Sequence, residues 1–255
     1  MALELVVLPC LSDNYAYLLH DAGSGETAVV DAPEPAPILA ALEARGWSLA
    51  RILLTHHHAD HVAGAEALRE ATGAQILGAA ADAHRLPRLD EALSEGSELR
   101  LGAESARVIE VPGHTLGHIA FHFPDSGLLF SGDSLMVMGC GRLFEGTPAQ
   151  MWQSLLKLSA LPPETRLCSG HEYAEANLRF ALSLEARNPA LMLRACTIAG
   201  IRREGRPTVP AQLSEELATN PFLRARDPEV KASVGMAGAE DASVFAALRA
   251  RKDKF

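Results

Sequence analysis

The most informative segment of this sequence is Arg51-Ile-Leu-Leu-Thr-His-His-His-Ala-Asp-His61. Its first residues form a short apolar run that predicts a buried β-strand, and Gly64 with a helical pattern follows shortly afterwards. The side chains from Thr55 to His61 are therefore expected in a loop at the carboxyl edge of a sheet. A strand, a polar loop and a helix in this order are typical of an α/β fold.

Three later places repeat this pattern, in which an apolar strand ends, a glycine follows and a polar side chain comes next. They are residues 108–111 before Pro112-Gly113-His114, residues 128–130 before Ser131-Gly132-Asp133, and residues 167–168 before Ser169-Gly170-His171. Glycine lets the backbone turn freely after each strand. Because strand ends on one edge converge, four separate segments can deliver His and Asp side chains to one point.

These side chains form two sets of metal ligands. His56, His58 and His114 make the first set, Asp60, His61 and His171 make the second, and the carboxylate of Asp133 can bridge both. A two-metal hydrolytic site, with ions about 3.5 to 4 Å apart, requires such a set together with a hydroxide between the metals as the nucleophile. Imidazole and carboxylate ligands suit Zn, Fe or Mn, and we expect two divalent ions per chain, with zinc preferred.

The remaining histidines have other expected roles. His57 lies between two proposed ligands and is expected to point away from them, either as a structural residue or as a support behind the ligands. The others are expected on the surface or in the core, with His118 the least certain because it lies near His114: His20, His84, His118 and His122. Asp31 stands at a strand end, where it either supports the loop below the metals or forms an ordinary turn.

The chain divides into two parts by its pattern. Strands are predicted over 3–8, 16–20, 27–31, 51–55, 75–77, 107–111, 118–123, 128–131 and 166–169, with helices over 36–45, 64–72 and 149–160. After Gly170 no further strand is predicted, and helices are expected over 173–187, 189–204, 214–219 and 239–252. We therefore predict an α/β metal-binding catalytic domain over 1–171 and a smaller all-helical domain over 172–255.

Composition excludes several classes of protein. The 255 residues carry a formal charge of -9, which disfavours a nucleic-acid partner. With 48% hydrophobic and 22% charged residues the chain is expected to fold rather than stay disordered. The four cysteines form no C-x-x-C pair, and the N-terminus has Glu4 where a signal peptide needs basic residues. A cytoplasmic protein without membrane contact is expected, as a monomer or a weak homo-oligomer.

The metal motif resembles that of the metallo-β-lactamase superfamily, which carries T-H-x-H-x-D-H, a distal G-H, a bridging Asp and a last His on an αββα sandwich. Within it the chain resembles the glyoxalase II (hydroxyacylglutathione hydrolase) family essentially from end to end. The segments that carry this closer resemblance are 112–118, Gly139-Cys140-Gly141-Arg142-Leu143-Phe144-Glu145-Gly146, Gly170-His171-Glu172-Tyr173, Asn220-Pro221-Phe222-Leu223-Arg224 and 249–253.

The resemblance implies that a glutathione thioester, S-D-lactoylglutathione, is hydrolysed to glutathione and D-lactate, the second step of methylglyoxal detoxification. Asp60 and Asp133 are implied as catalytic residues that hold the attacking hydroxide. The implied substrate contacts are Arg142, Phe144, Tyr173, Arg249 and Lys252. Animal members carry tyrosine at the position of Phe144 and lysine at that of Arg142, and phenylalanine cannot donate the hydrogen bond of that tyrosine. A thiolate leaving group needs little protonation, which agrees with the absence of an obvious general acid.

Three alternatives stay open at this point. A persulfide dioxygenase of the same superfamily acts on a glutathione derivative but uses one iron and a smaller ligand set. A lactonase or β-lactamase could use the same metal site but would leave the C-terminal cations without a role. A non-enzymatic, metal-loaded binding module is the third alternative, and a metal-replete protein inert to every thioester would favour it.

Overall fold

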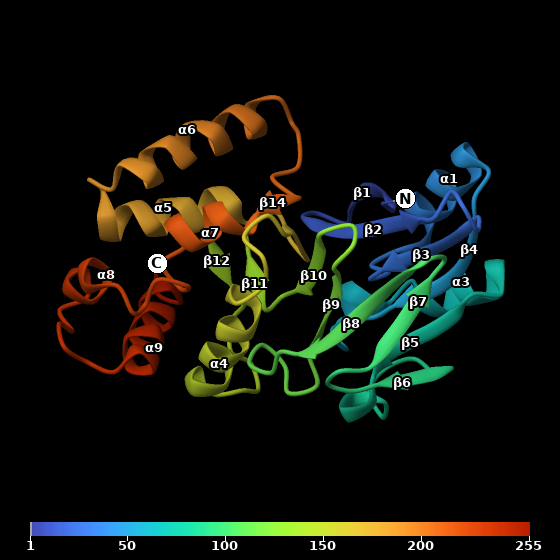
Figure 1. The fold of residues 1–255 in the computed structure, drawn as a ribbon, viewed down its shortest axis with the longest axis horizontal. Coiled ribbons are helices and arrows are strands. Elements are labelled where there is room, and N and C mark those ends of the chain that lie inside the picture. Colours follow the sequence, from blue (N-terminus) through green and yellow to red (C-terminus); the bar gives the residue numbers. More distant parts are fainter. Residues whose placement is uncertain (1) are drawn as a thin grey trace.

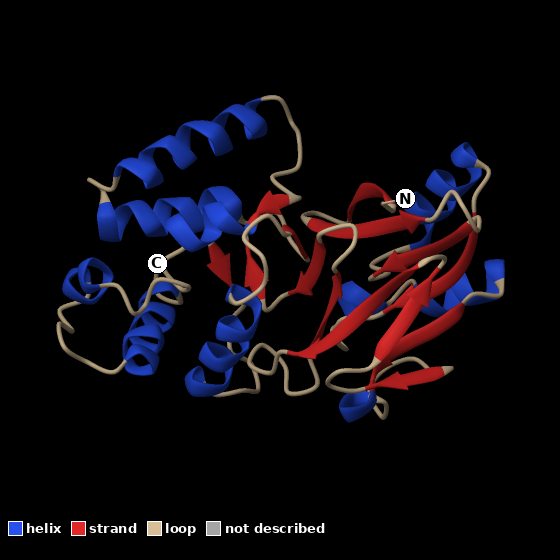
Figure 2. Ribbon diagram, in the orientation of Figure 1, coloured by secondary structure: helices blue, strands red, loops and turns tan. Residues whose placement is uncertain are grey.

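Two six-stranded sheets face each other at the centre of the computed structural model, which describes residues 2–255 (Figures 1 and 2). The first sheet has the order β1-β2-β3-β4-β5-β6, and its strands are β1 (Glu4–Cys10), β2 (Asn14–His20), β3 (Glu26–Val30), β4 (Ser48–Leu53), β5 (Gln75–Ala79) and β6 (Glu91–Leu93). The second has the order β14-β13-β10-β9-β8-β7, with β7 (Glu98–Leu101), β8 (Glu104–Glu110), β9 (Ile119–Phe123), β10 (Leu128–Gly132), β13 (Arg166–Ser169) and β14 (Ala211–Gln212). A small hairpin of β11 (Leu135–Met136) and β12 (Gly139–Cys140) stands apart.

Helices cover the outer face of each sheet. Apolar residues of α1 (Pro35–Arg45) and α3 (Ala65–Thr72) pack on the first sheet, where Ile38 and Leu68 join Ile52 in one buried cluster. On the second sheet, α4 (Pro148–Ser159) contributes Trp152 to a cluster that also contains Leu129. A third cluster fills the space between the two sheets, and each layer therefore buries its apolar side. The predicted αββα sandwich is confirmed.

The C-terminal part is helical, as predicted, with one correction. Its helices are α5 (Ala174–Glu185), α6 (Pro189–Arg203), α7 (Leu213–Thr219), α8 (Pro228–Ser233) and α9 (Asp241–Lys252). The prediction of no strand after Gly170 is wrong, because β14 pairs antiparallel with β13 through Gln212 opposite Arg166 and Ala211 opposite Leu167. Two residues are too few to show the alternation by which a strand is recognised.

The loops that follow β4, β8, β10 and β13 come together at one end of the sandwich. β8, β10 and β13 lie in the second sheet, where β10 and β13 run parallel, whereas β4 lies in the first sheet. The site is thus built between two sheets and not along the edge of a single one. Within residues 2–255, no helix has the length and apolar character needed to cross a membrane.

Candidate metal centre

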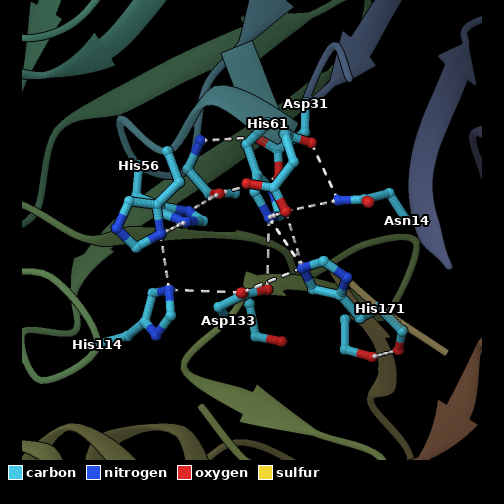
Figure 3. A network of polar contacts seen from close by, with 12 residues as sticks. Asn14, Asp31, His56, His61, His114, Asp133 and His171 are labelled. Carbon is cyan, nitrogen blue, oxygen red and sulfur yellow. Dashed lines mark hydrogen bonds and ion pairs between the residues drawn. The ribbon is translucent and has the colours of Figure 1, made fainter. Parts of the chain in front are cut away.

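The seven predicted ligands converge at this end of the sandwich (Figure 3). Their ligand atoms fall into overlapping groups within 4.8 Å, two of which are His56, His58, His114 and Asp60, His61, His171. These two groups coincide with the two sets expected from the sequence. Asp60 and His61 lie on a short helix, α2 (Ala59–Val62). The segment predicted as a loop therefore contains one helical turn.

In the first set, three ring nitrogens point at one another. His58 Nδ1 lies 3.1 Å from His56 Nε2 and 3.0 Å from His114 Nε2. In the second set, His61 Nε2 lies 3.2 Å from His171 Nε2, which is 3.4 Å from Asp60 Oδ2. These separations are short enough for one cation to contact every member of a set.

Asp133 stands between the two sets. Its Oδ2 lies 3.4 Å from His114 Nε2 and 3.3 Å from His171 Nε2, and its Oδ1 lies 3.6 Å from His61 Nε2. Asp133 is 5% exposed, and no residue of the described chain donates a hydrogen bond to its Oδ1. A buried carboxylate oxygen without a donor is costly, and a cation would satisfy it.

In four histidines, the ring nitrogen that faces away from the centre, Nδ1, has a hydrogen-bond partner that places a proton on it. His61 Nδ1 donates to Asp31 Oδ2 at 2.8 Å, His171 Nδ1 to Asp13 Oδ1 at 2.8 Å and His114 Nδ1 to the Arg142 carbonyl at 2.8 Å. His56 Nδ1 lies 3.0 Å from the Thr55 hydroxyl, which already donates to Asp31 and so accepts from the ring.

The pKa values of His56 and His114 are lowered, so these two neutral rings present an unprotonated Nε2 to the centre, and His61 and His171 turn the same nitrogen towards it. Lone pairs only about 3 Å apart repel unless a cation lies among them, and outer partners that fix the tautomer are typical of metal-binding histidines. The residues present fit two divalent ions.

Burial and charge shift the ionisation of the centre in opposite directions. Burial lowers the pKa of His56 well below its usual value, and the neighbouring His61 adds to this effect. Burial also lowers the pKa of His61, but the carboxylates of Asp133 and Asp31 outweigh it and raise the pKa to about 9. Burial thus favours the neutral form of His56 in the first set, whereas the carboxylates favour the protonated form of His61 in the second.

Two glycines allow the close approach of the ligand segments. Gly132 has φ of 46°, in the left-handed region, and a Cβ there would lie 2.6 Å from Thr55 Oγ1. At Gly170 a Cβ would lie 2.3 Å from Asp133 Oδ1 and 2.7 Å from His61 Cε1. The glycine before His171 is therefore needed for packing, whereas the sequence suggested only a free turn.

The other histidines and Asp31 now have defined positions. His57 turns away from the centre, as expected, and its Nδ1 lies 3.0 Å from Asp82 Oδ2. His118 is fully buried, and its Nε2 accepts the backbone N–H of Asp133 at 3.1 Å. Asp31 supports the loop, because it accepts the Thr55 N–H as well as the His61 ring.

Sequence reasoning missed Asp13 and Asn14. Asp13 accepts from His171, and Asn14 Nδ2 donates to Asp60 Oδ2 at 3.1 Å. Both stand in Ser12-Asp13-Asn14-Tyr15, whose composition is that of any turn between two strands. The one feature that could have indicated their role is that this turn follows a predicted strand, as the four ligand segments do.

A cavity of about 600 Å³ opens beside the ligands. Its lining includes His58, Asp60, Asp133 and His171 together with all five residues expected to contact substrate, namely Arg142, Phe144, Tyr173, Arg249 and Lys252. The ring of Phe144 is 63% exposed and meets the His114 ring edge-on at 5.2 Å between centroids. The ring of Tyr173 stacks on His171 with centroids 4.8 Å apart.

The two C-terminal cations, Arg249 and Lys252, differ in how far protein groups already occupy their hydrogen-bond donors. The Arg249 guanidinium is buried, donates to the Cys140 carbonyl at 2.8 Å and pairs with Asp253 at 2.8 Å. Lys252 Nζ donates to the Ala176 carbonyl at 3.2 Å and is half-buried. Burial lowers the pKa of Lys252, and the nearby guanidinium groups of Arg249, Arg179 and Arg142 lower it further. Like charges gathered in this way favour an anionic ligand, and Arg179 is a member that the sequence did not indicate.

Comparison with known proteins agrees with this architecture. Residues 12–171 match the family model described as "Metallo-beta-lactamase superfamily", and residues 172–255 match "Hydroxyacylglutathione hydrolase C-terminus". Among solved structures, BLEG-1 B3 metallo-β-lactamase has a TM-score of 0.67 at 21% identity, over 86% of this chain and 99% of that chain. The structure of TTHA1623 in a di-iron-bound form has a TM-score of 0.62 at 27% identity, over 86% of this chain and 100% of the other.

Two sandwiched sheets with His and Asp side chains converging at one end define a protein of the metallo-β-lactamase superfamily with a divalent metal site. Curated relatives identify the family within this superfamily. Hydroxyacylglutathione hydrolase of Cereibacter sphaeroides is 69% identical over 100% of both chains, and that of Methylococcus capsulatus is 54% identical over 99% of both. The chain belongs to the hydroxyacylglutathione hydrolase, or glyoxalase II, family.

Proposed function

We propose that this enzyme hydrolyses S-D-lactoylglutathione and related 2-hydroxyacylglutathiones to glutathione and the free hydroxy acid. The observation that carries the proposal is that one cavity holds both the ligand sets and the cationic cluster of Arg142, Arg249 and Lys252. A glutathione thioester has the matching chemistry, since its peptide part is anionic and its reacting carbonyl is neutral. The names of the full-length relatives support the same reaction.

Two divalent ions, held by the sets that share Asp133, would lower the pKa of a water molecule towards neutrality and polarise the thioester carbonyl. Asp60 is suited to orient that water, because its side chain is 43% exposed towards the cavity and one oxygen is fixed by Asn14. The sulfur leaves as a thiolate whose conjugate acid has a pKa of about 8.5, so a protonating residue is not needed.

The substrate contacts are proposed to come from both parts of the chain. Arg142 and Phe144 lie in the proposed catalytic domain, 1–171, and the proposed glutathione-binding domain, 172–255, supplies Tyr173, Arg249 and Lys252. Arg249 is fixed by Asp253 and the Cys140 carbonyl, so it acts mainly as a buried charge, whereas Lys252 has ammonium protons free for a carboxylate.

Zinc is the proposed metal, and the imidazole and carboxylate ligands suit it, as they also suit iron and manganese. Iron is the competing choice, since the structurally similar TTHA1623 holds two irons. The four cysteines are free thiols, three of them buried, which supports a reducing compartment such as the cytoplasm. A monomer or a weak homo-oligomer is proposed.

The decisive experiment is a steady-state assay of purified protein with S-D-lactoylglutathione, with metal content measured by elemental mass spectrometry on the same sample. Release of glutathione and D-lactate in equal amounts by protein holding two ions is expected. A protein replete in metal but inert to the thioester would refute the proposal. Oxygen uptake with glutathione persulfide would instead identify a persulfide dioxygenase.

A further inference from the structure

The turn between β1 and β2 is paired with the segment that carries His171. Tyr15 N–H donates to the Gly170 carbonyl at 2.9 Å, and Glu172 N–H donates to the Asp13 carbonyl at 2.8 Å. Asn14 and His171 stand opposite each other as an isolated antiparallel bridge. The first turn of the chain is thereby fixed in register against a ligand segment far away in the sequence.

From this register, two consecutive side chains reach two different ligands of the second set. Asp13 Oδ1 accepts the His171 Nδ1–H at 2.8 Å. Asn14 is 3% exposed, and its Nδ2 donates to the Asp60 backbone carbonyl at 3.0 Å as well as to the Asp60 side chain at 3.1 Å. One dipeptide therefore orients two of the three residues that make up the second set (Figure 3).

The first set is supported from elsewhere. His114 is oriented by the Arg142 carbonyl and His56 by the Thr55 hydroxyl. Both supports lie on loops other than the β1–β2 turn. Loss of the Asp13 and Asn14 side chains therefore removes support from one metal position and leaves the supports of the other in place.

We propose that Asp13 and Asn14 are positioning residues that set the occupancy of the second metal position independently of the first. The proposal rests on the ligand sets given under the proposed function. Removal of a group that orients a metal ligand typically weakens metal binding about 10 to 100-fold. A loss of this size empties one position at limiting metal and leaves the other filled.

The test measures metal per chain in Asp13→Ala and Asn14→Ala after dialysis against buffer with a limiting concentration of zinc. Two ions are expected in the unmodified protein and about one in each variant, with the weaker ion bound about 10 to 100-fold less tightly in a zinc titration. Ser12→Ala is the matched control and should retain two ions, because Ser12 is exposed in the same turn and its long hydrogen bond of 3.4 Å goes to Asp13 Oδ2, not to the Oδ1 that accepts from His171. Asp13→Asn should recover part of the affinity, since its amide oxygen still accepts from His171.

Double variants identify which ion is lost. Asp13→Ala combined with His58→Ala should hold no ion, whereas Asp13→Ala combined with His171→Ala should hold one, like His171→Ala alone. The ion retained in each single variant, with an unchanged circular dichroism spectrum, shows that the protein is folded.

Two ions in both single variants, or loss of both ions from either one, would overturn the inference. These results are distinct from failure of the proposed ligand sets, which would appear as fewer than two ions in the unmodified protein.

Discussion

Gly170 packs its backbone directly against the metal centre. A methyl group there would have to displace both Asp133, at 2.3 Å, and His61, at 2.7 Å, and both are proposed ligands. We expect Gly170→Ala to lower kcat/KM at least about tenfold and to reduce metal per chain below two. Gly200→Ala is the control, because a Cβ at that helical position meets nothing within 4 Å and should leave both values unchanged. Full metal content in Gly170→Ala would show that the ligand segments are not closely fitted.

Lys252 is the cation that we propose binds a substrate carboxylate. Its pKa is lowered by burial and by neighbouring guanidinium groups, so an anion in the cavity relieves repulsion between them. We expect Lys252→Met to raise KM for S-D-lactoylglutathione about 10 to 100-fold with little change in kcat, the size of a lost charged hydrogen bond of about 1.5 to 3 kcal/mol. Lys254→Met, at an exposed position two residues away, should leave KM unchanged. An equal KM in both variants would exclude Lys252 from substrate binding.

The sequence predicted the proposed ligands better than their supports. His56, His114 and His171 were recognisable because four separate strand ends each carry His or Asp side chains, which together make two full ligand sets. Asp13 and Asn14 were not recognisable, since Asp and Asn are the ordinary residues of turns. The proximity of Arg179 to Lys252 was also not predicted, because it depends on how separate helices pack.

Among the loops, the one carrying Phe144 is tied to the rest of the site by Glu145. Arg85 Nη2 donates to Glu145 Oε2 at 3.1 Å, and the same carboxylate accepts the Leu116 N–H at 2.8 Å. Arg85 also pairs with Asp82, the partner of His57. A loop of the substrate cavity, the loop after β8 and the metal loop are thereby joined in one network.

This network predicts a pH dependence of stability. The hydrogen bond from Arg85 lowers the pKa of Glu145 from 4.5 to about 2. As the pH falls the unfolded chain takes up this proton first, so the contribution is complete above pH 4.5 and disappears towards pH 2. Because the pair is partly exposed, we expect Glu145→Gln to cost about 1 kcal/mol of unfolding free energy near pH 6 and almost nothing near pH 2.

Urea unfolding at both pH values measures this difference. Glu98→Gln, at an exposed position in β7, is the control and should behave like the unmodified protein. A cost for Glu145→Gln that is the same at both pH values would contradict the assigned cause.

Among the helices and strands, predictions succeeded where a run of residues was long enough to show a hydrophobic period. The central strands and the long helices α1, α4, α5 and α6 were predicted within a few residues of their observed ends. The elements that were missed are mostly short, namely α2, α8, β6, β7, β11, β12 and β14. Their pairing is decided by tertiary contacts, which leave little trace in a run of two to six residues. The convergence of the four strand ends was predicted, but not that β4 belongs to the opposite sheet.

For the molecule as a whole, the centre couples metal binding to stability. Without cations, ring nitrogens about 3 Å apart and a buried carboxylate oxygen without a donor face one another between the two sheets. Binding of one ion at a hundredfold excess over its Kd adds about 2.7 kcal/mol to the unfolding free energy. We therefore expect a chelator, which removes both ions, to lower Tm by at least about 5 to 10 °C.

Asp133→Ala tests the same coupling from the protein side, because its carboxylate lies between both sets. This variant should hold neither ion, show no hydrolysis and melt at a temperature that the chelator does not change. Scanning calorimetry with and without chelator checks both expectations. A Tm of the unmodified protein that is insensitive to chelation would mean that the cluster is not a metal site.

The short strand β14 has a consequence for how the chain is made. During synthesis, β13 is complete about forty residues before its neighbour at positions 211–212 exists, so one side of the second sheet stays unprotected while the nascent chain grows. Open strand edges recruit other strands. A polypeptide ending at residue 171 would leave Arg166 and Leu167 without their strand partner and is expected to aggregate, so we expect the last third of the chain to protect the sheet in addition to its proposed role in substrate binding.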